Sequence, residues 1–294
     1  MKFIGFTRKN TAINLPEEDS FGIEEHSGSL FVCTADGITR DPIGLKHFPE
    51  RDAKGIAEFS SHYLRPSPAK DASQECVSKI LEHLRVIQAE EGRIGRDGIF
   101  NSFSYANQHL LSFNNWRIGP ITDYLENDWL ACVASAGVIL DHILYYGYIG
   151  DCGVLVINEG GDLVKRTPNE VEKTSNYLKS LRNGSLFNDP WRDPMWRANV
   201  RREYRNRTDN PYAYGAFTGE PGALKFVHTG KAHLGLGYYV LFYSDGMEKI
   251  LFSNDSIGKH LAQNGLERLE EICEKVAQSV GCKAEGTLVA VAVE

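Results

Sequence analysis

The sequence has no long hydrophobic run. No stretch of it approaches the roughly 18 consecutive apolar residues that a membrane-spanning helix needs. The N-terminal segment MKFIGFTRKN contains no apolar core of the length found in secretory signal peptides. These two absences predict a cytoplasmic protein that has no membrane partner.

The sequence also lacks paired cysteines. Its six cysteines include no C-x-x-C motif, and most of them lie inside apolar runs. Buried free thiols are therefore expected in place of zinc ligands. Unpaired thiols of this kind are typical of a reducing compartment, which agrees with the cytoplasm.

An excess of positive charge is missing as well. The net charge of −7 at pH 7 argues against a nucleic-acid partner, because proteins that bind phosphate backbones usually carry a basic surface. An acidic chain can still bind a phosphorylated substrate if metal ions or a local basic patch attract the phosphate. The 294 residues suffice for one large domain or two small ones.

Apolar patterning indicates strands and helices that are grouped separately. In residues 69–90, apolar side chains recur at helical spacing. Three apolar runs in residues 130–157, with turn residues between them, predict an antiparallel meander. Further helices are expected over 98–115 and 266–281, and strands over 2–6, 20–35, 238–243 and 287–293. Because these elements do not alternate as βαβ units, the expected fold class is α+β.

Residues 168–222 interrupt the apolar pattern. They hold five of the eleven prolines, and six arginines lie between residues 192 and 207. The segment is not of low complexity, so it is predicted to be an inserted flap within a single domain of residues 1–294.

Several acidic residues stand at the ends of predicted strands. Asp36-Gly37 follows LFVCTA and Asp245-Gly246 follows YYVLFYS, whereas Asp97-Gly98 follows a polar run and is expected in a turn. Glu18-Asp19 precedes a strand, and Asp151 lies at an expected hairpin. Neighbouring strand ends can converge when two sheets pack together, which would bring these acids to one place.

Converging carboxylates repel one another unless a cation compensates their charge. A ligand set made only of oxygen favours magnesium, manganese or calcium over zinc. Glycine after aspartate frees the backbone, so a carbonyl oxygen can also approach the ion. Spacing alone leaves two interpretations open: a metal site, or ordinary hairpin and capping acids.

Six segments carry a more specific signal: EEDSFGI, LFVCTADG, GYIGDCGVLV, YGAFTGEPGA, YYVLFYSDGM and GTLVAVAV. In order and approximate spacing they resemble the protein phosphatase 2C family, the metal-dependent serine/threonine phosphatases, including its bacterial members. SYANQHLLSFN is similar to a helix of that family. The resemblance extends from about residue 2 to residue 293. It implies a four-layer α-β-β-α sandwich of two antiparallel sheets with a two-metal cleft between them.

The resemblance also implies a set of metal ligands: Glu18, Asp19, Asp36, the Gly37 carbonyl, Asp151 and Asp245. By this likeness Asp36 bridges two Mn²⁺ or Mg²⁺ ions, and Asp245 binds one of them. Asp19 belongs to an acidic pair that binds metal directly or through water, and Asp151 matches a residue linked to a third, weaker ion. Asp19, Asp36 and Asp245 are accordingly the expected catalytic residues.

The implied reaction is hydrolysis of phosphoserine or phosphothreonine. Two cations roughly 3.5–4 Å apart lower the pKa of a shared water, so that a metal-bridging hydroxide attacks phosphorus in line. The cations also neutralise the phosphoryl oxygens in the transition state. No covalent phosphoenzyme is needed, in agreement with the lack of an obviously activated cysteine.

The sequence departs from the family at two places. Where the family has two acidic residues before its last strand, this chain has Ala284 and Glu285. Either the longer Glu285 side chain reaches the metal or the ion is bound more weakly. The family's phosphate-binding arginine is replaced by Asn14, and Arg8 or Lys9 is the candidate substitute.

The arginines of the predicted flap offer another way to bind an anion. Guanidinium groups pair well with phosphate, which makes Arg192 and Arg197 candidate substrate-binding residues, together with Arg201 and Arg202. The alternative is a solvated surface helix whose charges serve solubility.

The sequence thus predicts a manganese- or magnesium-dependent phosphatase whose partner is a phosphorylated protein. Two other functions stay open. One is a catalytically weakened relative that uses the same fold as a binding or regulatory module, as Ala284 and the missing arginine would suggest. The other is a phosphatase for a small phosphorylated metabolite. The sequence indicates neither the pathway nor the oligomeric state.

Overall fold

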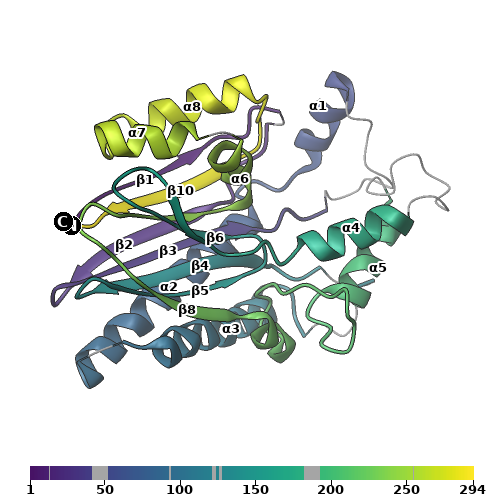
Figure 1. The fold of residues 1–294 in the computed structure, drawn as a ribbon. Coiled ribbons are helices and arrows are strands. Elements are labelled where there is room, and N and C mark those ends of the chain that lie inside the picture. Colours follow the sequence, from purple (N-terminus) through teal and green to yellow (C-terminus); the bar gives the residue numbers. More distant parts are fainter. Residues whose placement is uncertain are drawn as a thin grey trace.

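Two five-stranded antiparallel sheets lie face to face, with helices on both outer faces (Figure 1). The computed structural model describes residues 1–12, 14–41, 52–92, 94–120, 124–125, 128–181, 193–253 and 255–294. The predicted four-layer α+β sandwich is confirmed.

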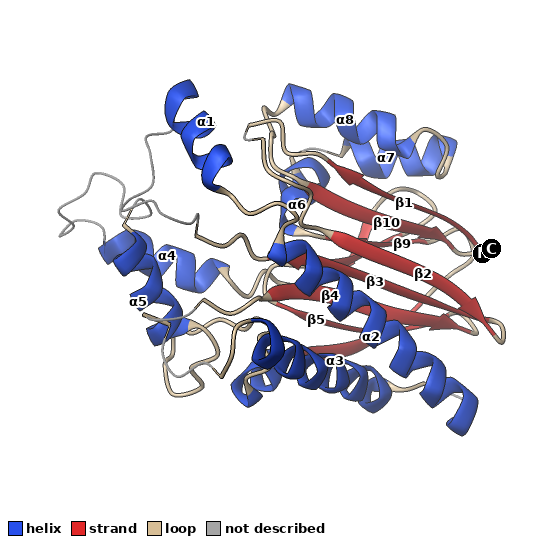
Figure 2. Cartoon of the chain, turned by 180° about the vertical axis from the view of Figure 1, so that it is seen from behind, coloured by secondary structure: helices blue, strands red, loops and turns tan. Residues whose placement is uncertain are grey.

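The first sheet contains the strand that ends in Asp36-Gly37. Its order is β2 (Ser20–His26), β3 (Ser29–Gly37), β4 (Cys132–Leu140), β5 (Ile143–Ile149) and β8 (His228–His233). Helices α2 (Pro68–Glu91) and α3 (Arg96–Arg117) cover its outer face (Figure 2). Both helices were expected from the apolar spacing.

The second sheet contains the two chain ends. Its order is β1 (Lys2–Arg8), β10 (Gly286–Ala292), β9 (Tyr239–Tyr243), β6 (Gly153–Ile157) and β7 (Leu163–Arg166). Its outer face packs on α6 (Asp245–Phe252), α7 (Ser256–Asn264) and α8 (Leu269–Ser279). The helix expected over 266–281 is α8.

Three further helices lie beyond the strand ends, at the end of the sandwich opposite the termini (Figure 1). They are α1 (Ala53–His62), α4 (Glu172–Leu181) and α5 (Pro194–Tyr204). A 3₁₀ helix, η3 (Pro221–Phe226), follows the segment after α5. Helices α4 and α5 belong to the predicted flap, and they stand next to the strand ends that carry the acidic residues.

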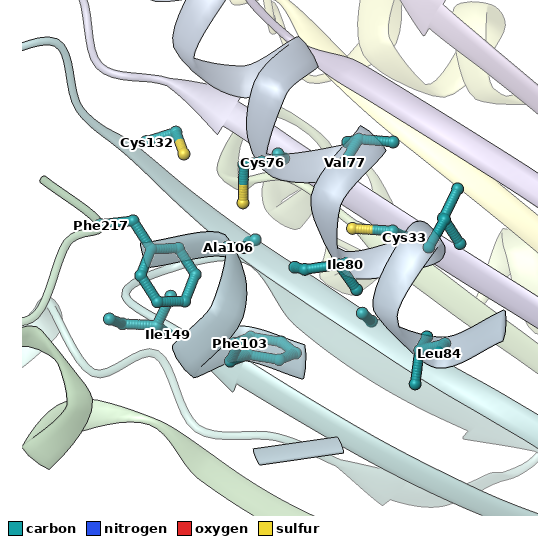
Figure 3. Packing of buried hydrophobic residues seen from close by; sticks show 14 of the residues in the cluster. Cys33, Cys76, Val77, Ile80, Leu84, Phe103, Ala106, Cys132, Ile149 and Phe217 are labelled. Atoms are coloured by element: carbon teal, nitrogen blue, oxygen red, sulfur yellow. The ribbon is translucent and has the colours of Figure 1, made fainter. Parts of the chain in front are cut away.

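Strand β3 is apolar on both faces because it is covered on both sides. Alternate side chains of a strand point to opposite faces. Val32 accordingly packs between the sheets with Phe242, whereas Phe31 and Cys33 pack under α2 with Ile80 (Figure 3). The unbroken run LFVC is thus the signature of a strand in the middle of the sandwich.

The meander predicted over 130–157 is only half right. Strands β4 and β5 form the expected hairpin at Asp141-His142, but β6 belongs to the other sheet. Gly150 lies at the crossover with φ +76°, and a Cβ there would stand 2.4 Å from the Val133 side chain. Glycine is therefore needed at this point, where the chain leaves one sheet for the other.

The turn predicted at Asp97-Gly98 is wrong. Both residues lie in the first turn of α3. An acidic side chain there interacts favourably with the positive end of the helix dipole. A Cβ on Gly98 would meet the Ile94 side chain at 3.2 Å, so the glycine reflects close packing of the helix start.

Five of the six cysteines are buried and Cys282 is half-buried, and all six are free thiols, as expected. Within the described parts of the chain, no helix has the length and apolar composition that crossing a membrane requires. The cellular compartment stays a prediction.

Candidate metal and phosphate site

A cavity of about 400 Å³ opens between the strand ends of both sheets and helices α4 and α5. Its acidic lining comes from five separate segments: Glu18, Asp19, Asp36, Asp151, Asp245 and Glu285. The wall formed by α5 and its C-cap adds three arginines, Arg197, Arg201 and Arg205. All six predicted acidic residues are thus brought together.

The two Asp-Gly dipeptides are sites of close backbone packing. A Cβ on Gly37 would stand 2.4 Å from the Ala69 carbonyl oxygen, and one on Gly246 would stand 1.5 Å from the Glu285 carbonyl oxygen. Neither distance leaves room for a side chain. The glycines therefore let neighbouring segments approach the aspartates, so that Asp36 at the end of β3 and Asp245 at the start of α6 reach the same cavity.

Asp19 is held by the opposite sheet. The Ser244 hydroxyl, which directly follows β9, donates a 2.6 Å hydrogen bond to Asp19 Oδ2. The same hydroxyl accepts a 2.9 Å bond from the Thr287 amide. This relay across the two sheets fixes the Asp19 carboxylate beside the strand end that carries Asp245.

Burial raises the affinity of all four aspartates for protons. Burial, together with the charge of Asp245, raises the pKa of Asp19 to about 6 and that of Asp151 to about 7. Burial also raises the pKa of Asp36 well above its usual range, with added repulsion from the other three. Within the described residues, no lysine, arginine or histidine forms an ion pair with these four.

This donor set fits a hard divalent cation. It consists of buried oxygens that carry like charge, and a cation would relieve the repulsion that now raises their pKa values. No group of three His, Cys, Asp or Glu side chains is already arranged as an ion site in the described residues. Binding would therefore require the carboxylates to draw together around the ion.

Glu18 is held by the hydroxyl groups of neighbouring loops. Its Oε1 accepts hydrogen bonds from the Tyr63 hydroxyl at 2.5 Å and from the Ser67 hydroxyl, and its Oε2 accepts one from Thr39 at 2.5 Å. The residue is 4% exposed. Three hydroxyl donors already satisfy the carboxylate, so Glu18 anchors the surrounding loops. Metal binding by Glu18, directly or through water, stays a prediction.

Glu285 lines the cavity. Its Oε1 accepts the backbone N–H groups of Glu18 and Asp19, at 2.8 and 2.9 Å. Burial, followed by the charge of Asp19, raises the pKa of Glu285 to about 7. Glu285 thus positions the acidic pair, and metal binding by it stays a prediction.

The expected phosphate-binding role of Arg8 is not supported. Arg8 does not line the cavity: its Nε donates a 2.9 Å hydrogen bond to Glu274, and its Nη1 donates a 3.4 Å bond to the carbonyl oxygen of Ala284. Lys9 is exposed and pairs with Glu17 at 3.2 Å. Arg192 lies outside the described residues.

The interpretation of α5 as a solvated surface helix is wrong for its inner face. The side chains of Arg197 and Arg201 are 13% and 7% exposed, and each bonds Asp41 Oδ1 at 2.7 Å. Burial lowers the pKa of Arg197 to about 10, which leaves it protonated at neutral pH. Arg205 and Asp128 were not among the predicted site residues. The spacing of four residues between Arg197, Arg201 and Arg205 would have placed Arg205 on the same helix face as the other two.

The carboxylate cluster predicts an unusual pH dependence of stability for the metal-free protein. A carboxyl group whose pKa is higher in the folded state binds its proton more tightly there, so stability falls as pH rises from about 4 through about 7 and then levels off. Urea unfolding in EDTA should give a free energy of unfolding about 1–3 kcal/mol higher at pH 5 than at pH 8. A free energy of unfolding that does not change with pH, or that rises with pH, would contradict the prediction that these buried carboxyl groups have raised pKa values.

Solved structures share this fold. The S. agalactiae serine/threonine phosphatase is 15% identical, covering 100% of this chain and 99% of that one, with a TM-score of 0.61. The catalytic domain of the phosphatase PstP with two manganese ions is 13% identical, covering 100% and 98%, with a TM-score of 0.59. RsbX with magnesium is 11% identical, covering 98% and 92%, with a TM-score of 0.53.

No protein-family model matches the sequence, and no curated protein is significantly similar to it in sequence. The resemblance to the phosphatase family is thus confirmed at the level of the fold. At sequence identities this low, the structural match establishes the architecture, and the activity has to be argued from the site.

Proposed function

We propose that this chain is a metal-dependent phosphatase that hydrolyses phosphoserine and phosphothreonine in proteins. The observation that carries the proposal is the meeting of Asp19, Asp36, Asp151 and Asp245 in one cavity at the sheet ends. The fold that places them there is the one shared with solved serine/threonine phosphatases. In this proposal residues 1–294 form one catalytic domain, with α4 and α5 as its flap.

The proposed ligands of two or three Mn²⁺ or Mg²⁺ ions are Asp19, Asp36, Asp151, Asp245, the Gly37 carbonyl and Glu285. Bound divalent cations supply a nucleophilic water at neutral pH and charge to neutralise the phosphoryl oxygens. The solved relatives that hold manganese and magnesium support this choice of ion.

The protein holds the proposed ligand residues in position. The Ser244 hydroxyl fixes Asp19, and Glu285 holds the backbone of the acidic pair in position. Asp36 lies in β3 of one sheet, and Asp245 begins helix α6, which one residue separates from β9 of the other sheet, so regular elements hold both residues. Arg197, buried on the cavity wall, is the proposed substrate-binding residue.

Metal removal tests the proposal. Hydrolysis of p-nitrophenyl phosphate and of a phosphothreonine peptide should require millimolar Mn²⁺ or Mg²⁺. EDTA should lower the rate at least about a hundredfold, and added Mn²⁺ should restore it. Circular dichroism should show that the EDTA-treated protein stays folded.

Turnover of small phosphate esters without any phosphopeptide hydrolysis would favour a metabolite phosphatase. No turnover from folded protein with either ion would favour the binding or regulatory module.

A further inference from the structure

The wall of the cavity formed by α5 is basic. Arg197, Arg201 and Arg205 are four residues apart, so their side chains share one face of the helix and its C-cap. All three line the cavity that also holds the aspartates. The Arg201 and Arg205 side chains are only 7% and 3% exposed.

Among the described residues, two carboxylates stand against this face. Asp41 bonds Arg197 and Arg201 at 2.7 Å. Asp128 lies 3.2 Å from Arg201, but its oxygens are 4.0 Å from Arg205 Nη1 and 3.7 Å from Arg40 Nε. In the part of the chain that the structure describes, Asp41 and Asp128 are thus each shared by more than one guanidinium group, and the two longer contacts exceed hydrogen-bonding distance.

Arg205 has an unmet donor. Its Nη1 is fully buried and has no hydrogen-bond partner in the described structure, and its Nε reaches only the Tyr214 hydroxyl, at 3.4 Å. A buried charged donor without an acceptor is costly, and such groups call for a ligand or other compensation. Arg205 is 98% buried, with a relative exposure of 2%, and it borders the cavity.

The arginines and the aspartates line the same cavity. Because five residues of chain connect Asp36 to Asp41, which pairs with Arg197 and Arg201, the Cα atoms of these two aspartates are at most about 18 Å apart. Cations at Asp36 would attract the phosphoryl group that reacts. The guanidinium groups, in contrast, attract an anion without any metal.

We propose that Arg205, with Arg197 and Arg201, forms a second anion subsite for a carboxylate or phosphate that neighbours the phosphorylated residue of the substrate. The inference rests on the proposed function and narrows its substrate class. It predicts phosphoproteins with an acidic or second phosphorylated residue beside the one that is hydrolysed. Asp41 and Asp128 already form ion pairs with these arginines through their carboxylates. The ligand is expected to bind the same guanidinium groups through a carboxylate or a phosphate.

The first test needs no catalysis. Inorganic phosphate is titrated calorimetrically into the EDTA-treated full chain, as wild type, Arg205→Gln and Arg202→Gln. Arg202 lies on the same helix but outside the cavity lining and pairs with Glu203, so its variant matches the charge change. The affinity should fall about tenfold in Arg205→Gln and stay unchanged in Arg202→Gln. Equal loss in both variants, or in neither, would overturn the subsite.

The second test separates the sources of the anion. With Mn²⁺ present, kcat/KM is measured for three phosphothreonine peptides whose neighbouring residue is neutral, acidic or phosphorylated. The wild type should prefer the two charged peptides about tenfold, mainly through KM, and Arg205→Gln should lose this preference. A preference that survives in Arg205→Gln contradicts the proposal. If no peptide is hydrolysed, the proposed function fails while the phosphate titration still decides the subsite.

Arg205→Lys guards against a variant that does not fold. It keeps the charge and loses the planar fork, so its phosphate affinity should lie between those of the wild type and Arg205→Gln. Thermal unfolding of each variant shows that the protein measured is folded. Wild-type affinity in folded Arg205→Lys, together with wild-type affinity in folded Arg205→Gln, excludes a role for this side chain.

Discussion

Asparagine in place of Asp36 is expected to lower metal-dependent hydrolysis of p-nitrophenyl phosphate at least about a thousandfold, because the central carboxylate of the ion site would lose its charge. The charges of Asp19, Asp151 and Asp245 all act on Asp36, which makes it the central carboxylate of the proposed ligand set. The measurement is kcat/KM at saturating Mn²⁺, together with Mn²⁺ affinity by calorimetry. Both should fall together.

The matched control is Asp97→Asn, the same substitution in the Asp-Gly pair that begins α3 away from the cavity. It should retain wild-type activity. In EDTA, Asp36→Asn should unfold at a higher urea concentration than the wild type, since the substitution removes a buried charge that repels three others. Full activity in Asp36→Asn, or an unfolded protein, would contradict the proposed site.

The second large effect concerns Glu18. Alanine at this position should lower the free energy of unfolding by about 3 kcal/mol, because the hydroxyls of Tyr63, Ser67 and Thr39 would lose their buried acceptor. Urea unfolding in EDTA measures this loss without any contribution from metal. Glu18→Gln, which keeps the oxygen acceptor, should lose less.

Glu17→Ala is the neighbouring control. Glu17 is exposed and pairs only with the surface residue Lys9 in the described structure, so its loss should change stability by less than about 0.5 kcal/mol. If Glu18→Ala instead keeps its stability and loses Mn²⁺ affinity, Glu18 is the direct metal ligand that the family likeness implies, and its role as an anchor is wrong.

Local patterns in the sequence predicted the α+β class and drew attention to the acidic residues at strand ends, whereas the four-layer sandwich was predicted from the family resemblance. A strand covered on both faces must be apolar throughout, as LFVC is, and an amphipathic helix repeats apolar residues every three or four positions. An aspartate followed by glycine at a strand end was also visible. Its interpretation as more than a turn depended on two such pairs following strands, and the third pair proved to begin a helix.

Roles that depend on distant partners could be decided only by the tertiary structure. The donors to Glu18 lie 21, 45 and 49 residues away, and nothing near Glu18 in the chain indicates that they satisfy it. In the same way Arg8 looked available for phosphate until Glu274 proved to hold it, 266 residues later. The periodicity of apolar residues indicates which way a side chain faces. The residues that the side chain contacts there depend on how the two sheets and α5 pack together.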